Sequence, residues 1–406
     1  MKKVTLLGVG LQGRTILHDL TQSDLVSEVI AADRDLVGLR KVAATLASTR
    51  LTCVALDVND TDATARLMGD SDIVIETLPS KFCLPMAKLA VQNRVHLVNT
   101  MYLVDAGETD PVKRQKLEEE VRELDSRARA VQVTILPEFG MDPGIDLVLC
   151  GQAVKDFDEV HELYSYGAGF PELLAADNPL RYKISWTFEG VLKSYFRPGR
   201  ILKEGRVVEI SADAMFVKEN THEFDLEGFG RMEAYPNGDA VRYAEILGIR
   251  NQVRTMGRYV LRWPGHCEFW EKLAKLHFLD DAPIRVGEMP VVPREFLRSL
   301  LEPQLQYGDN ERDVAVIRVD ARGLKAGKRR RVIYQVIDRR DLRTGFTAMT
   351  RTVGFTASIG AQMIVRGDIQ KRGILAPVRD VPFAIFADEL RKRGIQVEHI
   401  TGSWEN

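Results

Sequence analysis

Three carboxylates crowd one short turn of the sequence, PEFGMDPGID at residues 137–146. Glu138, Asp142 and Asp146 surround a stiff Asp-Pro-Gly corner between a β-rich run, VQVTIL, and an apolar run, LVLCGQAV. An ordinary turn from a strand into a helix needs one capping residue and one glycine. The additional carboxylates could transfer a proton, and their negative charge would suit a cationic amine substrate.

Asp142 is the first candidate for a general base. Glu138 is its candidate partner, because a second negative charge nearby would tune how readily Asp142 takes up a proton. A plainer interpretation stays open, in which Asp142 caps a helix that opens with Pro143 at its first position. That structural interpretation applies more strongly to Asp146.

Two further residues are of types that could act on a substrate. His266 follows Pro-Gly and titrates near neutral pH, so it is the second candidate for proton transfer, although an isolated histidine can equally be structural. Lys183 alternates with Tyr182 on an expected strand and could bind a substrate carboxylate, although it could also be a solvated strand lysine. No His or Cys spacing resembles a metal site.

A glycine-rich motif stands at the start of the chain. LLGVGLQG carries Gly8-x-Gly10-x-x-Gly13 between the first expected strand and the first expected helix, and Asp33 closes the second strand. This context predicts a dinucleotide loop, in which the glycines allow a tight turn, close approach of a pyrophosphate and helix packing. Asp33 favours NAD through the ribose hydroxyls, whereas Arg34 could hold the 2′-phosphate of NADP. We expect NAD, with NADP possible.

The strands and helices that position these residues are expected to alternate along the first part of the chain. Residues 1 to about 140 read as strands and helices in turn, from KKVTLLGV to VQVTIL, which predicts a parallel sheet covered by helices. From about 159 to 340, strands such as HELYSYGAG, VAVIRVDARG and RRRVIYQVI predict an α+β domain with a mainly antiparallel sheet. The expected fold class is therefore α/β: a Rossmann-type doubly wound parallel sheet with an inserted second α/β domain.

Ligands of such a sheet lie outside the carboxyl ends of its strands, where the acid turn and the segments ETLPS and NTMYLVD also fall. The expected dinucleotide contacts are Gly8, Gly10, Leu11, Gln12, Gly13, Asp33, Arg34, Asp57, Val58, Leu78, Pro79, Met141 and Gly144.

Composition excludes several classes of protein. The 406 residues carry 56 basic and 58 acidic side chains and a net charge of −2, so we expect neither nucleic acid nor a membrane as partner. The four cysteines are scattered and read as small buried side chains in a reducing cytoplasm.

Several motifs resemble those of the saccharopine dehydrogenase-like oxidoreductases, which include saccharopine reductase and lysine 6-dehydrogenase. The similar stretches are GMDPGID, NPLRYKISW, EAYPNGD and the tyrosine of NTMYLV, which is Tyr102. The resemblance covers most of the chain and implies a Rossmann domain at 1–143 and 346–406, with a substrate and dimerisation domain at 144–345. It also implies that the protein is a homodimer. Tyr102 could contact substrate or could be a packing aromatic.

One departure bears on substrate. Saccharopine reductases carry an Arg after the KISW-like motif, whereas this chain has Glu189 there, as lysine 6-dehydrogenases do. RYVLRWPGH and AQMIVRGDIQKRGI also resemble lysine 6-dehydrogenase. An anion in place of a cation would reject a dicarboxylic adduct and accept an ammonium group. The expected activity is NAD(P)-dependent oxidation at a CH–NH group of lysine or a lysine adduct. Saccharopine or carboxyspermidine-type imine reduction is the alternative, and a non-catalytic dinucleotide sensor is a third.

Overall fold

The computed structural model describes residues 1–105, 108 and 110–404. The chain divides into two compact units. Unit 1 comprises Met1–Gly151 and Thr350–Val397, and unit 2 comprises Gln152–Met349 and resumes at Glu398. Among the described helices, none has the length and apolar character needed to cross a membrane.

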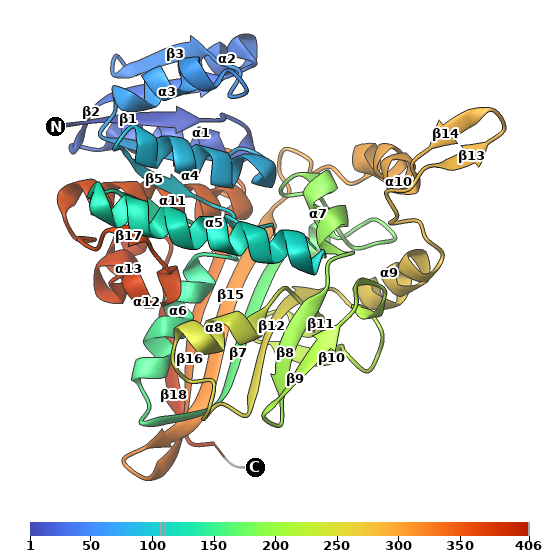
Figure 1. Ribbon diagram of the computed structural model, residues 1–406. Helices are drawn as coiled ribbons and strands as arrows, with labels where there is room; N and C mark the ends of the chain where they lie inside the picture. Colours follow the sequence, from blue (N-terminus) through green and yellow to red (C-terminus); the bar gives the residue numbers. More distant parts are fainter. Residues whose placement is uncertain (106–107, 109, 405–406) are drawn as a thin grey trace. The chain divides into compact units, whose positions relative to one another are not determined.

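Unit 1 is built on a seven-stranded parallel sheet (Figure 1). Its strand order is β17-β6-β5-β4-β1-β2-β3, with bounds β1 Lys2–Leu7, β2 Val26–Asp33, β3 Leu51–Ala55, β4 Ile73–Glu76, β5 His96–Asn99, β6 Thr134–Leu136 and β17 Gly373–Ile374. The central strands are short and mostly apolar, and β4 is buried at every position, as a sheet covered on both faces requires. The prediction of a doubly wound parallel sheet is confirmed.

Helices alternate with these strands along the chain. They are α1 Leu11–Gln22, α2 Leu36–Leu46, α3 Thr61–Gly69, α4 Cys83–Gln92, α5 Pro111–Ala130, α6 Ile145–Lys155, α11 Ala348–Arg366, α12 Pro377–Asp380 and α13 Phe383–Lys392, with the short 3-10 turn η1 at Ser80–Phe82. Because the sheet is parallel, every strand ends at the same edge, and the loops after β1, β4, β5 and β6 all leave from it.

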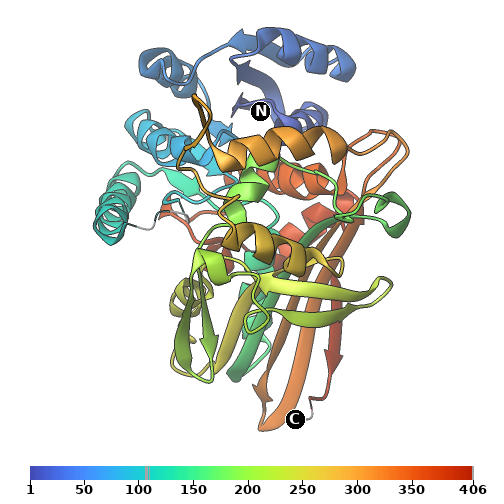
Figure 2. The same cartoon turned by 90° about the vertical axis from the view of Figure 1, so that its right-hand side faces the viewer.

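Unit 2 contains a nine-stranded sheet whose main path is β10-β11-β12-β7-β15-β16-β18, with β8 and β9 off this path. The bounds are β7 Glu159–Pro171, β8 Gly199–Lys203, β9 Arg206–Ile210, β10 His222–Leu226, β11 Gly230–Pro236, β12 Thr255–Arg262, β15 Asp313–Lys325, β16 Lys328–Arg339 and β18 Glu398–Gly402. Among the described strand pairs of this sheet, only β7–β12 is parallel, so the sheet is mainly antiparallel, as expected. Figure 2 shows the long β15–β16 hairpin, whose strands pair in continuous register.

Two expectations about this part of the chain are wrong in detail. The residues from 398 onward were expected in the first domain, but β18 hydrogen-bonds to β16 and therefore belongs to unit 2. The segment around Tyr182 and Lys183 was expected to be a strand, but it is irregular chain between the turn η2 Leu173–Ala175 and helix α7 Phe188–Ser194.

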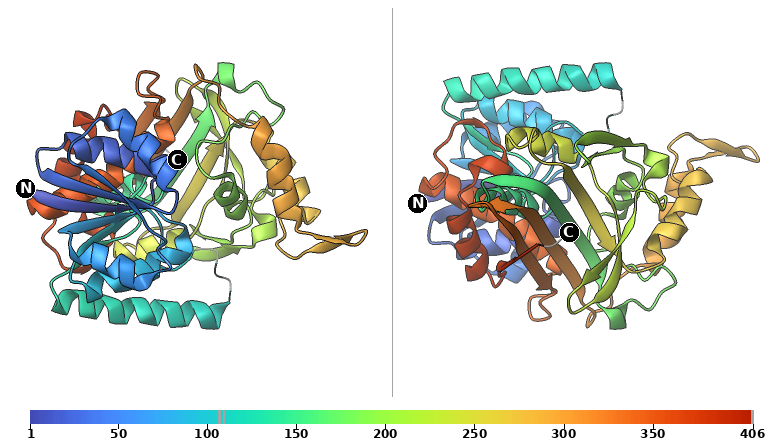
Figure 3. Two further views of the ribbon diagram at one scale, coloured as in Figure 1. Left: turned by 90° about the horizontal axis from the view of Figure 1, so that it is seen from above. Right: turned by 90° about the horizontal axis from the view of Figure 1, so that it is seen from below.

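The remaining elements of unit 2 flank its sheet. They are α8 Ala240–Ile246, α9 His266–Lys275, α10 Pro293–Leu301, the turns η3 Ala212–Ala214 and η4 Glu302–Gln304, and a separate two-stranded hairpin of β13 Ile284–Val286 and β14 Met289–Val291. The hairpin stands out from the rest of unit 2 in both views of Figure 3. We call the hairpin together with α10, residues 284–301, the arm.

Candidate dinucleotide and catalytic site

The glycine loop after β1 has the geometry that a dinucleotide requires. Gly8 adopts φ +87°, a left-handed conformation that favours glycine. A Cβ at Gly13 would lie 2.5 Å from the Gly8 carbonyl oxygen, so only glycine lets α1 pack this closely on the turn. A Cβ at Gly10, by contrast, would meet nothing within 4 Å. The backbone at Gly10 thus faces open space, into which a pyrophosphate can approach.

The N-terminus of α1 supports the same assignment. Gly10 is the N-cap, and no side chain caps the helix. Uncapped N–H groups and the helix dipole together attract an anion. These observations fit a bound nicotinamide dinucleotide, whose diphosphate would lie at this helix end. The dinucleotide would supply a hydride acceptor.

Asp33 closes β2 beside the loop. One carboxylate oxygen accepts a hydrogen bond from the Val9 N–H at 2.7 Å, and the other accepts one from the Asp35 N–H at 2.9 Å. Asp33 therefore ties the glycine loop to the end of β2. Each oxygen retains a second lone pair that a ribose hydroxyl could use.

Arg34 is exposed at the same corner, where it could contact the adenosine end of a dinucleotide. The pKa of Asp57, after β3, is lowered chiefly by the Asn59 backbone and side chain, with smaller contributions from the Arg34 and Lys81 charges. Other expected contacts also fall on the carboxyl edge: Leu11 and Pro79 are exposed, and Gln12, Val58 and Leu78 are partly buried.

The acid turn is a closed backbone structure. The Gly140 N–H donates to the Pro143 carbonyl at 2.9 Å, and the Ile145 N–H donates to the Gly140 carbonyl at 3.0 Å. Gly144 has φ +146°, and a Cβ there would lie 2.0 Å from the Gly140 oxygen. The Asp142–Pro143 peptide bond is cis. The expected cofactor contacts Met141 and Gly144 are buried inside this turn.

The carboxylates of this turn differ in their surroundings. Asp146 is fully buried and accepts the Gly144 N–H at 2.8 Å, which gives it the structural role weighed above. Asp142 is only half-buried. The cap interpretation of Asp142 is wrong, because α6 begins at Ile145 and its first helical residue is not Pro143.

Glu138 lies at the start of the same turn and is 4% exposed. Its N–H donates to the Met101 carbonyl at 3.0 Å, and the Phe139 N–H donates to the Asn99 carbonyl at 2.9 Å. These bonds join the turn to the loop after β5, which carries Tyr102. Unit 1 thus brings Glu138, Asp142 and Tyr102 onto adjoining loops at the carboxyl edge of its sheet.

Glu76, at the end of β4, was not singled out from the sequence. It is 1% exposed, and burial raises the pKa of its carboxyl to about 8. One oxygen accepts the Leu78 N–H at 2.9 Å, whereas Oε2 has no partner among the described residues. Its neighbour across the sheet, Asn99, likewise has an unpartnered Nδ2 in the described part of the chain. A carboxylate ending the apolar run DIVIE was the signal that could have revealed this residue.

Lys183 and Glu189, the two charged candidates in unit 2, both form ion pairs within the protein. Lys183 is 5% exposed, and its ammonium lies 2.7 Å from Glu311 and 2.9 Å from Asp177. It is therefore not a solvated strand lysine, and its donors are already used. Glu189 is exposed on α7 and pairs with Lys193 one turn later.

His266 begins α9 inside an aromatic cage. Its ring centroid lies 5.4 Å from that of Tyr195 and 6.0 Å from those of Tyr182 and Tyr235. Burial, and then the neighbouring Arg262 charge, hold its pKa well below the usual range, so the imidazole is neutral. Within the described structure Nε2 has no hydrogen-bond partner. The surroundings favour a hydrogen-bonding role over proton transfer at neutral pH.

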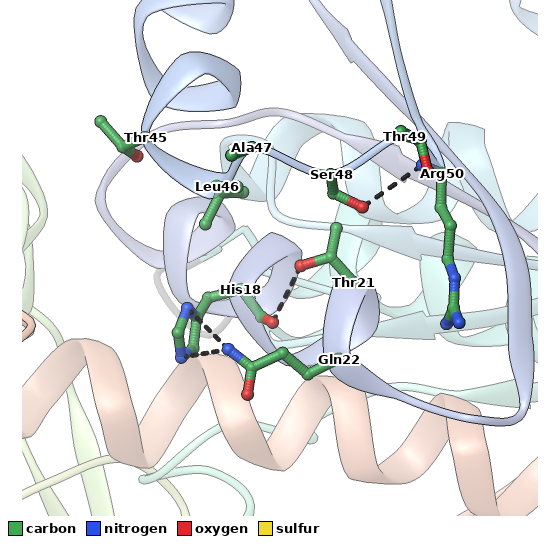
Figure 4. A pocket seen from close by; sticks show the side chains of 9 residues that line it. All are labelled: His18, Thr21, Gln22, Thr45, Leu46, Ala47, Ser48, Thr49 and Arg50. Carbon is green, nitrogen blue, oxygen red and sulfur yellow. Dashed lines mark hydrogen bonds between the residues drawn. The ribbon is translucent and has the colours of Figure 1, made fainter.

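A surface hollow of about 480 Å³ lies elsewhere in unit 1 (Figure 4). It is lined by the C-terminal half of α1 and the loop between α2 and β3, including His18, Thr21, Gln22 and Thr45–Arg50. These residues precede β3, so the hollow is at the opposite edge of the sheet from the glycine loop. Among the described residues, no group of three or more His, Cys, Asp or Glu side chains is arranged to hold a metal ion.

The fold of unit 1 and its glycine loop define a dinucleotide-binding Rossmann protein. Residues 4–136 match the family model of the saccharopine dehydrogenase NADP binding domain, and residues 140–395 match that of the saccharopine dehydrogenase C-terminal domain. The chain belongs to the saccharopine dehydrogenase family, which confirms the resemblance seen in the motifs. The match also confirms a nicotinamide dinucleotide as the class of cofactor. The choice between NAD and NADP stays a prediction.

Several known proteins are similar to this chain. The saccharopine dehydrogenase (NADP(+), L-glutamate-forming) of Saccharomyces cerevisiae is 25% identical over 443 residues, covering 93% of this chain and 94% of that protein. The mitochondrial alpha-aminoadipic semialdehyde synthase of Mus musculus is 25% identical over 460 residues, and the chain spans about half of its length, 47%. The structure of apo saccharopine dehydrogenase (L-Glu forming) from Saccharomyces cerevisiae matches with a TM-score of 0.82 and 23% identity, over 99% of this chain and 100% of that one.

Proposed function

We propose that the protein is an NAD(P)-dependent oxidoreductase that acts on a CH–NH group of an amino acid. The observation that carries this proposal is the placement of the acid turn and the glycine loop on the same edge of one parallel sheet. Ligands of such sheets bind at this edge. A half-buried carboxylate, Asp142, therefore lies at the same edge of the sheet as the loop that fits the dinucleotide.

Each residue has a role in the proposed reaction. The substrate carbon that bears the amine gives up a hydride, the amine gives up a proton, and water adds to the resulting imine. Asp142 takes the amine proton, and Glu138 supports it from the buried start of the turn. Tyr102 contacts the substrate from the adjoining loop. Placed this way, a general base contributes about 10²–10⁴-fold to the rate.

The proposed substrate is lysine, with oxidative deamination as in lysine 6-dehydrogenases. Glu189, an acid where saccharopine reductases carry an Arg, supports this choice, although its pairing with Lys193 makes the support modest. Lys183 is assigned no substrate contact in this proposal, because Glu311 and Asp177 occupy its donors. Saccharopine, or a carboxylated polyamine imine, is the second candidate, since the named relatives include saccharopine dehydrogenases.

Absorbance of the reduced dinucleotide tests the proposal. Purified protein is incubated with NAD or NADP and, in turn, L-lysine, saccharopine and a polyamine. Turnover with L-lysine is the expected result. Turnover with saccharopine alone would move the assignment to the second candidate. Tight dinucleotide binding without turnover of any amine would contradict the proposal and favour a dinucleotide sensor.

We also propose that two copies of the chain associate through the arm. Its apolar side chains are unusually exposed: Ile284 54%, Val286 53%, Met289 66%, Phe296 52% and Leu300 51%. A two-stranded hairpin open on both faces is at best marginally stable alone. Pairing the arm with its copy would remove these apolar side chains from water. Self-pairing through the central strands of the unit 2 sheet has less support, because β7 and β15 are largely buried.

Light scattering at micromolar concentration tests the dimer. The unaltered chain is expected to be a dimer, and Met289→Glu with Phe296→Glu is expected to give a monomer. The matched control is Leu174→Glu, which alters an apolar side chain 97% exposed outside the arm. A monomeric unaltered chain, or a dimeric arm variant, would contradict the proposal.

A further inference from the structure

Glu76 is a buried acid of unit 1 without a counter-ion. Its side chain ends β4, is 1% exposed and has one oxygen, Oε2, that lacks a partner among the described residues. The other oxygen accepts the Leu78 N–H at 2.9 Å and lies 4.0 Å from the Cys83 sulfur. In the described part of the chain, no Lys, Arg or His side chain pairs with this carboxyl. A buried carboxylate is costly unless it is paired, so Glu76 favours its neutral form.

Another buried glutamate of unit 1 has the partners that Glu76 lacks. Glu389, on α13, is 6% exposed, and its carboxylate oxygens lie 3.0 Å from Arg366 and 2.7 Å from Arg393. Burial by itself would raise the pKa of Glu389, but the hydrogen bonds from Arg393, Lys392 and Arg366 hold it below its usual value. The chain thus provides counter-ions for one buried acid, whereas the described residues provide none for Glu76.

The groups that face Glu76 from neighbouring elements are neutral or negative. Leu7 of β1 and Asn99 of β5 are its partners in the sheet. Burial, and then the Glu76 charge, raise the pKa of the Cys83 thiol on α4 well above its usual value, so the thiol stays protonated. Asp105, in the loop after β5, also acts on Cys83 and would add only negative charge. Since these described neighbours offer no cation, a positive charge beside Glu76 would have to come from a bound ligand.

The position of Glu76 in the sheet indicates which ligand this is. The strand order β17-β6-β5-β4-β1-β2-β3 reverses between β1 and β4, and a dinucleotide crosses the edge of such a sheet at that point. Its adenosine half belongs on the side of β2, which Asp33 ends, so its nicotinamide half belongs on the side of β4. The end of β4 is also joined to the glycine loop, because Thr77 Oγ1 donates to the Gly8 carbonyl at 2.8 Å.

We propose that Glu76 is the counter-ion of the oxidised nicotinamide ring: its carboxyl is protonated in the free protein and ionises when the positively charged ring binds. The proton passes to the solvent. The reduced ring is neutral and would leave the carboxyl protonated. This inference rests on the binding of a dinucleotide, and it goes beyond the proposed function by making Glu76 select the oxidised over the reduced form.

This selection is expected to depend on pH. Burial raises the pKa of Glu76 to about 8, so in the free protein its carboxyl is mostly neutral at pH 7 and mostly ionised at pH 9. A positive charge within about 4–6 Å lowers the pKa of a carboxyl by about 1–3. The affinity for the oxidised dinucleotide, relative to the reduced one, should therefore rise about five- to tenfold from pH 7 to pH 9.

Calorimetric titration of the full chain tests the proposal without any turnover. The oxidised and reduced forms of the tighter-binding dinucleotide are each added at pH 7.5 in two buffers that differ in ionisation enthalpy, and the difference in heat gives the number of protons released. The oxidised form is expected to release about 0.5–0.7 proton, and the reduced form close to none. ADP-ribose, which has the diphosphate but no nicotinamide ring, should behave like the reduced form.

Glu76→Gln assigns the proton to this residue. Asp142 and Glu138 lie at the same edge of the sheet, so a proton released by the unaltered protein could also come from one of them. The glutamine keeps the size of the side chain but cannot titrate, so proton release should vanish and the affinity ratio should no longer change with pH. The matched control is Glu120→Gln on α5, whose carboxylate pairs with Lys88 at 2.7 Å, and proton release should be unchanged in it.

Two results would overturn the proposal. One is proton release that is equal for the oxidised and reduced forms, or that persists in Glu76→Gln. The other is proton release with L-lysine alone and none with the oxidised dinucleotide, which would place the substrate ammonium beside Glu76. The comparison of the two forms uses the unaltered protein, so it does not depend on the folding of a variant. Failure of the proposed oxidation would instead appear as absent turnover with proton release intact.

Discussion

At the scale of single residues, burial decides which carboxylates titrate near neutral pH. Glu76 is the clearest case, because its pKa of about 8 lies well above the ordinary value of 4.5. Between those two values the folded protein holds a proton that the unfolded chain has released. Stability therefore falls as pH rises through this window, by about 1.4 kcal/mol for each pH unit, and levels off above pH 8.

Glu76→Gln should remove that dependence, since a glutamine has no proton to lose. Urea unfolding at pH 5.5, 6.5 and 7.5 measures it, and the profile of the variant should be flatter than that of the unaltered protein over this range. Parallel profiles for the two proteins would mean that Glu76 is ionised in the folded state and that its free oxygen has a partner.

The residues of unit 2 show where sequence reasoning reaches its limit. The sequence favoured Lys183 as a strand lysine that could bind a carboxylate. In the structure Lys183 forms an ion pair with Glu311, which lies 128 positions further along the chain. The sequence favoured His266 as a possible proton carrier, but its aromatic cage is assembled from the residue after α7, from β11 and from α9. Pairings between distant segments leave no local pattern, so charge and residue type alone could not reveal them.

At the scale of secondary-structure elements, local sequence patterns predicted much of unit 1 correctly. The continuous apolar strands and the glycine motif of unit 1 are local signals, and both the parallel sheet and the turn before α1 follow from them. The arm and β18 could not be predicted, because they carry no such local signal. β18 is exposed at every position and is a strand only because β16 offers it an edge.

The glycine loop yields a paired prediction. Gly10→Ala adds a Cβ that meets nothing within 4 Å, so the protein should fold normally, yet the methyl group would stand where the pyrophosphate approaches. Dinucleotide affinity should fall at least tenfold, which is about 1.4 kcal/mol. Fluorescence titration with NADH and NADPH measures it.

Gly13→Ala is the matched control for that titration. Its Cβ would lie 2.5 Å from the Gly8 carbonyl oxygen, so this variant should lose thermal stability as well as affinity. Unchanged dinucleotide binding in Gly10→Ala would remove the glycine loop from the cofactor site.

We expect Asp33, the last residue of β2, to set the preference between the two dinucleotides. Asp33→Ala should weaken NAD binding more than NADP binding, because the carboxylate is the proposed ribose acceptor. Competitive titration of the two dinucleotides measures the ratio. An unchanged NAD affinity would exclude Asp33 as that acceptor and favour Arg34 with a 2′-phosphate.

At the scale of the whole molecule, the proposed chemistry is assigned to unit 1, which carries both the dinucleotide loop and the acid turn. The family could be recognised from the sequence, because each of its motifs is a continuous stretch of residues. The substrate is harder to specify, because it depends on charges such as Glu189, whose partner only the folded chain shows.

The central claim is that the acid turn carries out proton transfer, and Asp142→Asn tests it most directly. The substitution keeps the size of the side chain but removes the base. Turnover of the preferred amine and affinity for the reduced dinucleotide are measured on the same preparation, with Asp146→Asn as the control inside the turn. Turnover should fall at least about a hundredfold in Asp142→Asn, with dinucleotide affinity unchanged. Near-normal turnover in that variant would contradict the account and leave the turn a purely structural feature.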